Sequence, residues 1–371
     1  MLKLIRNIPF YLFVIFYWLF VIEIVTMTSV YTTRGLLDFN DINWSKESNP
    51  VIYYLVSWNQ FVESALFAIF LGILFILINE LSETLHWDKF SFGKSLMYKS
   101  LLYIVGLVII FALVYTILTN FGSVDPSIYN DASAALKYFK EVFLVMGIYL
   151  IFNIILLNFI VQNIQKTGRQ NIISFLTGKY HRPIIEDRVF MFLDLKSSTS
   201  YAEKLGSIRY STMLRDCFHD INHIVREYHA QIYQYVGDEI VLTWEWNKKK
   251  DHINFIDLYF AFKNRLESRR KYYNEKYGLL PVFKAGLHGG NVTVAEIGQI
   301  KRDIAFHGDV LNTTSRIQDL CNPLKASFLI SDDLLSRIES KGNYLYKNLG
   351  EHLLRGKTKK VGLYAIEMPS I

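Results

Sequence analysis

Four apolar runs within the first 165 residues constrain the fold of this chain more than any other feature. They cover residues 8–26, 61–78, 101–118 and 142–161. A helix needs about 20 apolar residues to cross the hydrocarbon core of a bilayer, and each run approaches that length. The first run lacks a small-residue cleavage site and three more runs follow, which favours an anchor over a signal peptide. The sequence predicts a four-helix transmembrane domain over residues 1–162.

The lysines and arginines between these runs predict their orientation, because cytoplasmic loops carry an excess of both residues. The N-terminus, the middle loop and the exit from the last run carry Lys3, Arg6, Lys89, Lys94, Lys99, Lys166, Arg169, Lys179 and Arg182. The two opposite loops carry Arg34, Lys46, Lys137 and Lys140. We therefore expect a multi-pass protein of the inner cell membrane, with the N-terminus and the C-terminal half in the cytoplasm.

Three carboxylates lie near the outer ends of the runs: Glu23, Glu63 and Glu141. Because burying charge in a bilayer is costly, such residues are candidates for a sensing site for an unknown extracytoplasmic ligand. The alternative is that they reach the interface or pair with neighbouring lysines. The runs contain no path of paired charges or broken helices, which disfavours a transporter.

The composition of the chain excludes several classes of protein. The formal net charge is +6, and topology accounts for most of the lysines and arginines beside the apolar runs, so no nucleic-acid partner is predicted. The two cysteines, Cys217 and Cys321, are too few for a disulfide scaffold or a zinc site of their own.

Residues 163–187 are polar and basic, and they are predicted to connect the membrane domain to the rest of the chain. Ile160 and Ile164 have heptad-like spacing, which the following residues interrupt, and Pro183 ends any helix that continues from the membrane. A short helical coupler that pairs with a second chain and a passive linker are both consistent with this pattern.

Residues 188–371 alternate short β-branched or aromatic runs with amphipathic helical patterns. Strands are predicted over 189–193, on both sides of a turn within 232–244, and near 328–330, 344–349 and 361–366. The segment "PVFKAGLHGGNVTVAEIG" predicts a further strand pair. Such a mixture favours an α+β domain, in which helices cover a sheet.

Two acidic residues stand at the ends of predicted strands. In "FMFLDLKSST" a buried strand ends at Asp194, and Ser197, Ser198 and Thr199 follow as a turn and the start of a helix, where backbone amides favour anions. In "IYQYVGDEIVLTW" Asp238 lies at the tip of a hairpin. Each acid alone has a structural explanation, as a helix cap or a turn residue. Together, on adjacent strand ends, they are suited to share divalent cations with a nucleotide triphosphate.

Five segments in order resemble the class III nucleotidyl cyclases, the adenylate and guanylate cyclases. "FLDLKSST" and "YVGDEIV" resemble the two metal-binding segments, and "GLHGGNVTVAEIG" resembles the glycine-spaced hairpin between motifs. "HGDVLNTTSRI" resembles the transition-state segment and "LLRGK" the late triphosphate-binding segment. The connector "FLTGKYHRP" is similar to a transducing stretch that precedes many of these domains. The resemblance covers residues 189–367 and implies a ferredoxin-like, palm-type sheet with covering helices.

The resemblance implies a metal site and a reaction. Asp194, Asp238 and the Leu195 carbonyl would hold two Mg²⁺ or Mn²⁺ ions per site. Asn312 and Arg316 are four residues apart, so they share one helix face, from which an amide can fix a ribose and a guanidinium can face phosphate. The implied activity is that of an adenylate cyclase, which forms cyclic AMP and pyrophosphate from ATP.

The same resemblance implies a cation for the triphosphate at Arg355 and a shared active site. In the family the acids come from one domain, and the Asn, the Arg and the purine-reading residues come from another. A chain with one complete set is therefore expected to act as a homodimer with two sites.

The match departs from the family at the two purine-reading positions. Gln234 stands where a Lys is usual, and Ala305 stands where an Asp is usual, with Asp303 offset by two residues. A glutamine can donate and accept hydrogen bonds, so it can face adenine or guanine. ATP is the expected substrate, and a guanylate cyclase or a cyclase of mixed specificity is the alternative.

Two rival functions are less well supported by the sequence. A diguanylate cyclase would need a glycine at the position of Val236, and it would leave Asn312 and Arg316 unexplained. A catalytically silent membrane receptor that only binds nucleotide is disfavoured because the two acids, Asn312 and Arg316 are all present.

Overall fold

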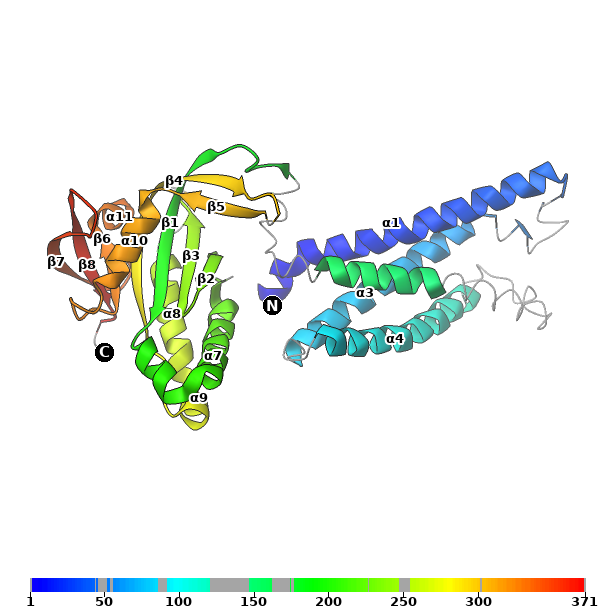
Figure 1. The fold of residues 1–371 in the computed structure, drawn as a ribbon. Coiled ribbons are helices and arrows are strands. Elements are labelled where there is room, and N and C mark those ends of the chain that lie inside the picture. The colour runs from blue at the N-terminus through cyan, green and yellow to red at the C-terminus, as the bar shows by residue number, and fades with distance from the viewer. Residues whose placement is uncertain are drawn as a thin grey trace. The chain divides into compact units, whose positions relative to one another are not determined.

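The computed structural model describes residues 2–43, 45, 52–53, 56–85, 92–120, 147–161, 174, 177–225, 227–246, 254–300 and 302–369. The chain divides into two compact units, Met1–Asn163 and Ile164–Ile371 (Figure 1). The predicted coupler pattern at Ile160 and Ile164 falls mostly on residues 162–173, which lie outside the described residues.

The first unit is helical. It contains α1 (Leu2–Phe39), α3 (Asn59–Thr84), α4 (Phe92–Asn120) and a shorter apolar helix, Gly147–Val161. Within the described residues, three helical stretches are long and apolar enough to cross a membrane: Phe10–Phe39, Asn59–Ser82 and Gly93–Ile110. The prediction of four spans is corrected to three, because a helix over 147–161 is only about 22 Å long, shorter than a hydrocarbon core of about 30 Å. Residues 142–146 of the predicted fourth span lie outside the described residues.

Polar groups inside this unit pair between helices. The Tyr17 hydroxyl donates to Asn153 Oδ1 at 3.0 Å, and the Ser64 hydroxyl donates to Glu23 Oε1 at 2.8 Å. Glu63 Oε1 is buried without a hydrogen-bond partner in the described part of the chain. Glu141 lies outside the described residues. The sensing role of these acids stays a prediction.

The second unit is built on one eight-stranded sheet with the order β2-β3-β1-β4-β6-β8-β7, and β5 pairs with β4. The strands are β1 (Ile184–Leu195), β2 (Gln231–Val236), β3 (Glu239–Glu245), β4 (Phe283–Ile297), β5 (Asp303–His307), β6 (Phe328–Ser331), β7 (Leu345–Leu353) and β8 (Lys360–Glu367). The β4–β6 pair is parallel and the other pairs are antiparallel. The predicted α+β class and the predicted acidic hairpin, now β2–β3, are confirmed.

Helices cover both faces of this sheet. They are α7 (Ser198–Val225), α8 (Asn254–Ser268), α9 (Arg270–Tyr277), α10 (Asp309–Asp319) and α11 (Asp332–Arg337). Side chains of a strand alternate between its two faces, and in β1 Met191 and Leu193 pack in the cluster with α7 and α8. Phe190 and Phe192 pack in another cluster with Val310 of α10. The alternation therefore places even-numbered residues of β1 on the α10 face.

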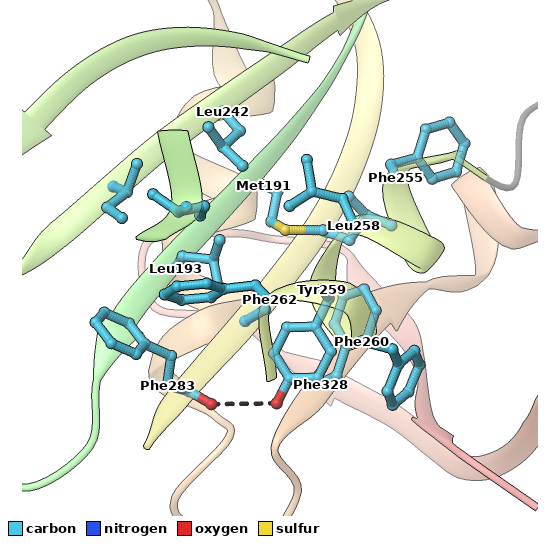
Figure 2. Packing of buried hydrophobic residues seen from close by; sticks show 14 of the residues in the cluster. Met191, Leu193, Leu242, Phe255, Leu258, Tyr259, Phe260, Phe262, Phe283 and Phe328 are labelled. Atoms are coloured by element: carbon cyan, nitrogen blue, oxygen red, sulfur yellow. Dashed lines mark hydrogen bonds between the residues drawn. The ribbon is translucent and has the colours of Figure 1, made fainter. Parts of the chain in front are cut away.

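The α8 face of the sheet is closed by aromatic packing (Figure 2). Tyr259 and Phe262 of α8 lie against Phe283 of β4 and Phe328 of β6, with ring centroids 4.4 Å apart for Tyr259 and Phe328. The Tyr259 hydroxyl donates to the Phe283 carbonyl at 3.1 Å, so this buried polar group is satisfied within the core.

The expected strand pair in "PVFKAGLHGGNVTVAEIG" is wrong, because β4 runs unbroken from Phe283 to Ile297. Its glycines do not form a turn. A Cβ at Gly286 would lie 2.5 Å from the backbone nitrogen of Gln318 in α10, and a Cβ at Gly290 would lie 3.0 Å from Val310 Cγ2. The glycines instead let α10 approach the strand closely.

A buried carboxylate fastens α7 to α8 and its neighbour α9. Asp220 of α7 is fully buried, and it accepts hydrogen bonds from Arg265 of α8, from Arg269, and from the Tyr273 hydroxyl of α9 at 2.7 Å. These contacts hold the helix whose first residue, Ser198, follows the Asp194 strand.

We expect Asp220→Ala to lower the free energy of unfolding by about 3 kcal/mol or more, because it leaves the two arginines and Tyr273 without their shared acceptor. Thermal unfolding of the solubilised full-length chain measures the loss. Glu267→Gln is the control, because the Glu267–Arg270 pair is exposed and its removal should cost less than about 1 kcal/mol. Equal losses for the two variants would contradict the anchoring role.

Candidate active site

Asp194 stands near the end of the central strand β1, between two residues of the neighbouring strands. Its direct partners in the sheet are Lys284 of β4 and Glu239 of β3. Residues directly opposite each other in a sheet share a face, and the alternation along β1 makes this the α10 face. Glu239, Asp194 and Lys284 therefore form a row across three strands, beside α10.

Two donors hold one oxygen of Asp194. The Lys284 ammonium lies 3.1 Å from Oδ2, and the Gln318 side-chain amide of α10 donates to the same oxygen at 3.0 Å. Among the described residues, no donor is bonded to the other oxygen, Oδ1. One half of the carboxylate is thus fixed by the protein, and the other half is available to a ligand.

Asp238, predicted as the second metal ligand, is close enough to Asp194 to affect its ionisation. Burial raises the pKa of the Asp194 carboxyl, the Lys284 ammonium opposes this, and the Asp238 charge adds to the rise. Burial, followed by the charges of Asp194 and Asp238, raises the pKa of Glu239 to about 7. Three carboxyl groups therefore share one region, with Lys284 as the cation in contact with Asp194.

This donor set fits Mg²⁺ or Mn²⁺ better than a metal that needs a closed cage. Within the described residues there is no group of three or more His, Cys, Asp or Glu side chains arranged to hold an ion. Mg²⁺ is usually bound by one or two carboxylates together with substrate phosphates. Asp194 and Asp238 supply two carboxylates, and the excess of negative charge around them favours a cation.

The serines after Asp194 lie where the sequence predicts them. Ser197 has a left-handed backbone with φ 61°, and α7 begins at Ser198, so Ser198 and Thr199 lie in its first turn. Tyr210, further along α7, was not predicted for the site. Burial raises the pKa of its phenol, the Asp238 and Asp194 charges add to the rise, and a hydrogen bond with Ser198 opposes it. Tyr210 therefore lies near the two acids.

Asn312 and Arg316 lie together on α10, as predicted, but on a different side from Gln318. At 100° per residue, Asn312 and Arg316 are about 40° apart, whereas Arg316 and Gln318 are about 160° apart. Arg316 pairs with Asp319 at 3.6 Å, and in the described structure neither Arg316 nor Asn312 contacts Asp194 or Asp238. One chain therefore turns Gln318, and not Arg316, toward its own Asp194.

The remaining predicted residues are spread around the domain. Gln234 is exposed on β2, beside an irregularity in the β2–β3 pairing. Ala305 is buried in β5 opposite Ala295, and its methyl group offers no hydrogen bond. Arg355 is exposed between β7 and β8, and Lys357 in the same turn pairs with Asp309 at the start of α10. Their roles toward a substrate stay predictions.

Lys284 and Gln318 were not among the residues predicted for the site. Lys284 can be recognised as a partner of Asp194 only from the register of β1 and β4. A local sequence pattern does not contain this register. Gln318 had a signal, because it follows Thr314 by four residues and so lies on the stripe that buries Val310 and Ile317. A polar side chain on a buried stripe needs a partner, but the sequence does not say which one.

Comparison with known proteins gives a consistent result. A family model described as "Adenylate and Guanylate cyclase catalytic domain" matches residues 183–368. The "Adenylate cyclase 2" of Rhizobium meliloti (strain 1021) is 36% identical over 204 residues, which are 55% of this chain and 56% of that protein. The photoactivated adenylate cyclase subunit beta of Euglena longa is 27% identical over 142 residues, 38% of this chain and 16% of that protein. The chain thus spans less than two thirds of either relative.

A solved structure shares the fold. The structure of a bacterial light-regulated adenylyl cyclase has a TM-score of 0.51 and 17% sequence identity, and the match covers 60% of this chain and 65% of that chain. At this level of identity the similarity concerns the fold of the domain.

The close approach of α10 to β4 gives a prediction. We expect Gly286→Ala to lower the free energy of unfolding by about 1–3 kcal/mol, because the new Cβ meets the Gln318 backbone and α10 must move. Gly290→Ala on the same strand is the control and should cost less, since its Cβ meets only the end of the Val310 side chain. Thermal unfolding of both variants checks this, and the reverse order would contradict the tight α10 contact.

Proposed function

The chain belongs to the family of adenylate and guanylate cyclase catalytic domains, and on that premise we propose that it is a membrane-anchored adenylate cyclase. It converts ATP to 3′,5′-cyclic AMP and pyrophosphate at sites shared by two copies of the chain. ATP is supported by the adenylate cyclase names of its relatives, among them the Rhizobium protein that is 36% identical.

The observation that carries the shared site is the orientation of α10. Asp194 is bonded to Gln318 of its own α10, while Asn312 and Arg316 are on a face turned about 120–160° away. Side chains so placed do not meet a substrate held at the same chain's acids. A second copy of the chain supplies Asn312 and Arg316 to these acids, and the arrangement is reciprocal in a symmetric dimer.

The metal-binding residues of the proposed site are Asp194, Asp238 and the Leu195 carbonyl. Bound Mg²⁺ or Mn²⁺ would lower the pKa of the ribose 3′-hydroxyl and neutralise triphosphate charge. Lys284 lies beside Asp194 and adds a positive charge that faces the same region. Ser197 and the first turn of α7, with Ser198 and Thr199, present backbone amides suited to phosphate oxygens.

The other residues orient the reacting groups. Asn312 fixes the ribose through its amide, and the Arg316 guanidinium binds the α-phosphate oxygens, where negative charge increases in the transition state. The 3′-hydroxyl gives its proton to water and its oxygen bonds to the α-phosphorus, while the bond from that phosphorus to the bridging oxygen breaks and pyrophosphate leaves. Arg355 provides a cation for the departing phosphates. To bind the phosphate, Arg316 must break its ion pair with Asp319. This pair is partly exposed, so breaking it costs little.

The purine is read by fewer groups than usual in this family. Gln234 is exposed and can donate to or accept from the edge of adenine, and Ala305 contributes only a methyl group. Asp303 accepts a hydrogen bond from the backbone N–H of Ile304, so it is partly engaged within its own strand.

The N-terminal helices support the proposed location of this site at a membrane. Three of them are long and apolar enough to span a bilayer. The loop charges support a cytoplasmic catalytic domain, and the proposed divisions are 1–162 for the membrane domain, 163–187 for the connector and 188–371 for the cyclase.

Purified full-length protein with Mg²⁺ or Mn²⁺ is expected to form cyclic AMP from ATP, and Asp194→Ala should reduce the rate at least 100-fold because a metal ligand is lost. Product from ATP and from GTP is measured separately by chromatography. Glu267→Gln, which removes an exposed carboxylate of α8, is the control and should keep the wild-type rate. Product from GTP alone would refute the assignment of ATP.

Mixed dimers test the shared site. Asp238→Ala and Arg316→Ala chains should each be inactive alone, whereas co-expressed chains should recover roughly a quarter of the wild-type rate, because half the dimers are mixed and each has one intact site. Differently tagged chains allow the mixed dimer to be isolated and its rate measured. An isolated mixed dimer that stays inactive would rule out the sharing of residues between chains.

A further inference from the structure

The hydrogen bond between Gln318 and Asp194 links the two groups of residues that the proposed mechanism assigns to different active sites. Gln318 lies two residues after Arg316 on α10, and its amide donates to Asp194 Oδ2 at 3.0 Å within the same chain. Because Arg316 is about 160° away around the helix, the two side chains leave α10 in nearly opposite directions.

Gln318 is better placed than Lys284 to fix the Asp194 carboxylate. Its side chain is only 3% exposed, and a neutral amide has no strong attraction to an arriving triphosphate. Its backbone is pressed against β4, where Gly286 leaves no room for a Cβ. One turn later Cys321 Sγ contacts the Ala285 carbonyl at 3.3 Å, so the end of α10 is held at two adjacent residues of β4.

The bond also leaves a defined part of the carboxylate for a ligand. Lys284 and Gln318 both bond to Oδ2, and the described residues offer no donor to Oδ1. A carboxylate that is bonded through one oxygen keeps its orientation while the other oxygen binds a cation. Partners of this kind beside a metal ligand typically contribute about 10-fold to 100-fold in metal affinity.

We propose that Gln318 is a positioning residue that orients Asp194 for the divalent cation, and that each α10 thereby serves both active sites of the dimer. This inference rests on the proposed cyclase function. The Asn312 and Arg316 side of α10 contributes to one site, and the Gln318 side orients the acid of the other. A displacement of α10 changes both sites together.

Direct metal binding tests the role of Gln318 without turnover. The solubilised full-length dimer is titrated with Mn²⁺ in the presence of 3′-deoxy-ATP, which lacks the attacking hydroxyl, and free Mn²⁺ is measured by paramagnetic resonance. Gln318→Met keeps the volume of the side chain and removes its amide, so we expect Mn²⁺ affinity to fall about 10-fold. Gln318→Asn, whose amide is too short to reach, should show the same loss.

Two further variants make the result specific. Thr314→Val changes a buried residue of α10 whose hydroxyl bonds within the helix, and it should leave Mn²⁺ affinity unchanged. If Thr314→Val loses as much Mn²⁺ affinity as Gln318→Met, helix packing alone is responsible and the proposal is overturned.

Asp194→Ala should lose Mn²⁺ binding. If Asp194→Ala binds Mn²⁺ with wild-type affinity, the proposed metal site is wrong. If only the two Gln318 variants bind Mn²⁺ with wild-type affinity, the positioning role is wrong and the cyclase assignment stands.

A dimer with one working site shows which site Gln318 serves. When one chain carries Arg316→Ala and its partner carries Asp238→Ala, both defects fall in one site, and the intact site uses the acids of the Arg316→Ala chain. Adding Gln318→Met to that chain should raise the Mn²⁺ concentration for half-maximal rate about 10-fold. Adding it to the other chain should leave this concentration unchanged. Equal effects from either chain would overturn the proposal.

Discussion

The fixed position of the Asp194 carboxylate is the constraint on which the rest of the site depends. Asp194 lies on the central strand of its half of the sheet, so pairing on both sides fixes its register against Glu239 and Lys284. The same alternation that buries Phe192 beneath the α10 face directs Asp194 to that face. A shift of one residue in β1 would turn the acid into the α7–α8 core, where burying an unpaired charge is costly.

The contact between α10 and β4 is the second requirement, and it explains why the middle of a long strand is rich in glycine. A glycine at position 286 weakens the strand, because it has no side chain to pack. The close contact with α10, which needs this glycine, offsets that loss. The approach brings Gln318 within hydrogen-bond distance of Asp194. Gln318 provides both the backbone contact with Gly286 and the side-chain contact with Asp194, so it links sheet, helix and acid inside the chain.

The sequence contains the local parts of this arrangement but not the contacts between them. The hairpin with Asp238 and the helix that carries Asn312 and Arg316 were predictable, because short-range patterns specify turns and helices. The glycines of β4 were misread as a turn, since a glycine needed for a tertiary contact looks the same in sequence as one needed for a turn. The pairing of Lys284 with Asp194 depends on residues 90 positions apart, beyond any local pattern. Helix length determines which N-terminal helices can cross a membrane. The fourth described helix, Gly147–Val161, is too short to be counted with the others.

The contacts between α10 and Asp194 bear on how the proposed enzyme is controlled. If Asp194 and α10 move as one body, a signal cannot separate the acid from Gln318 at little cost, but it can change how one chain's α10 faces the other chain's acids. Tyr180, at the end of the connector, is buried in the same cluster as Val310 of α10, and its carbonyl accepts from the N–H of Glu296. Packed side chains of this cluster therefore connect Tyr180 to α10. In the proposed symmetric dimer, a displacement of α10 would move Arg316 relative to the partner's acids in both sites at once, so the proposed activity would depend on the geometry between the chains.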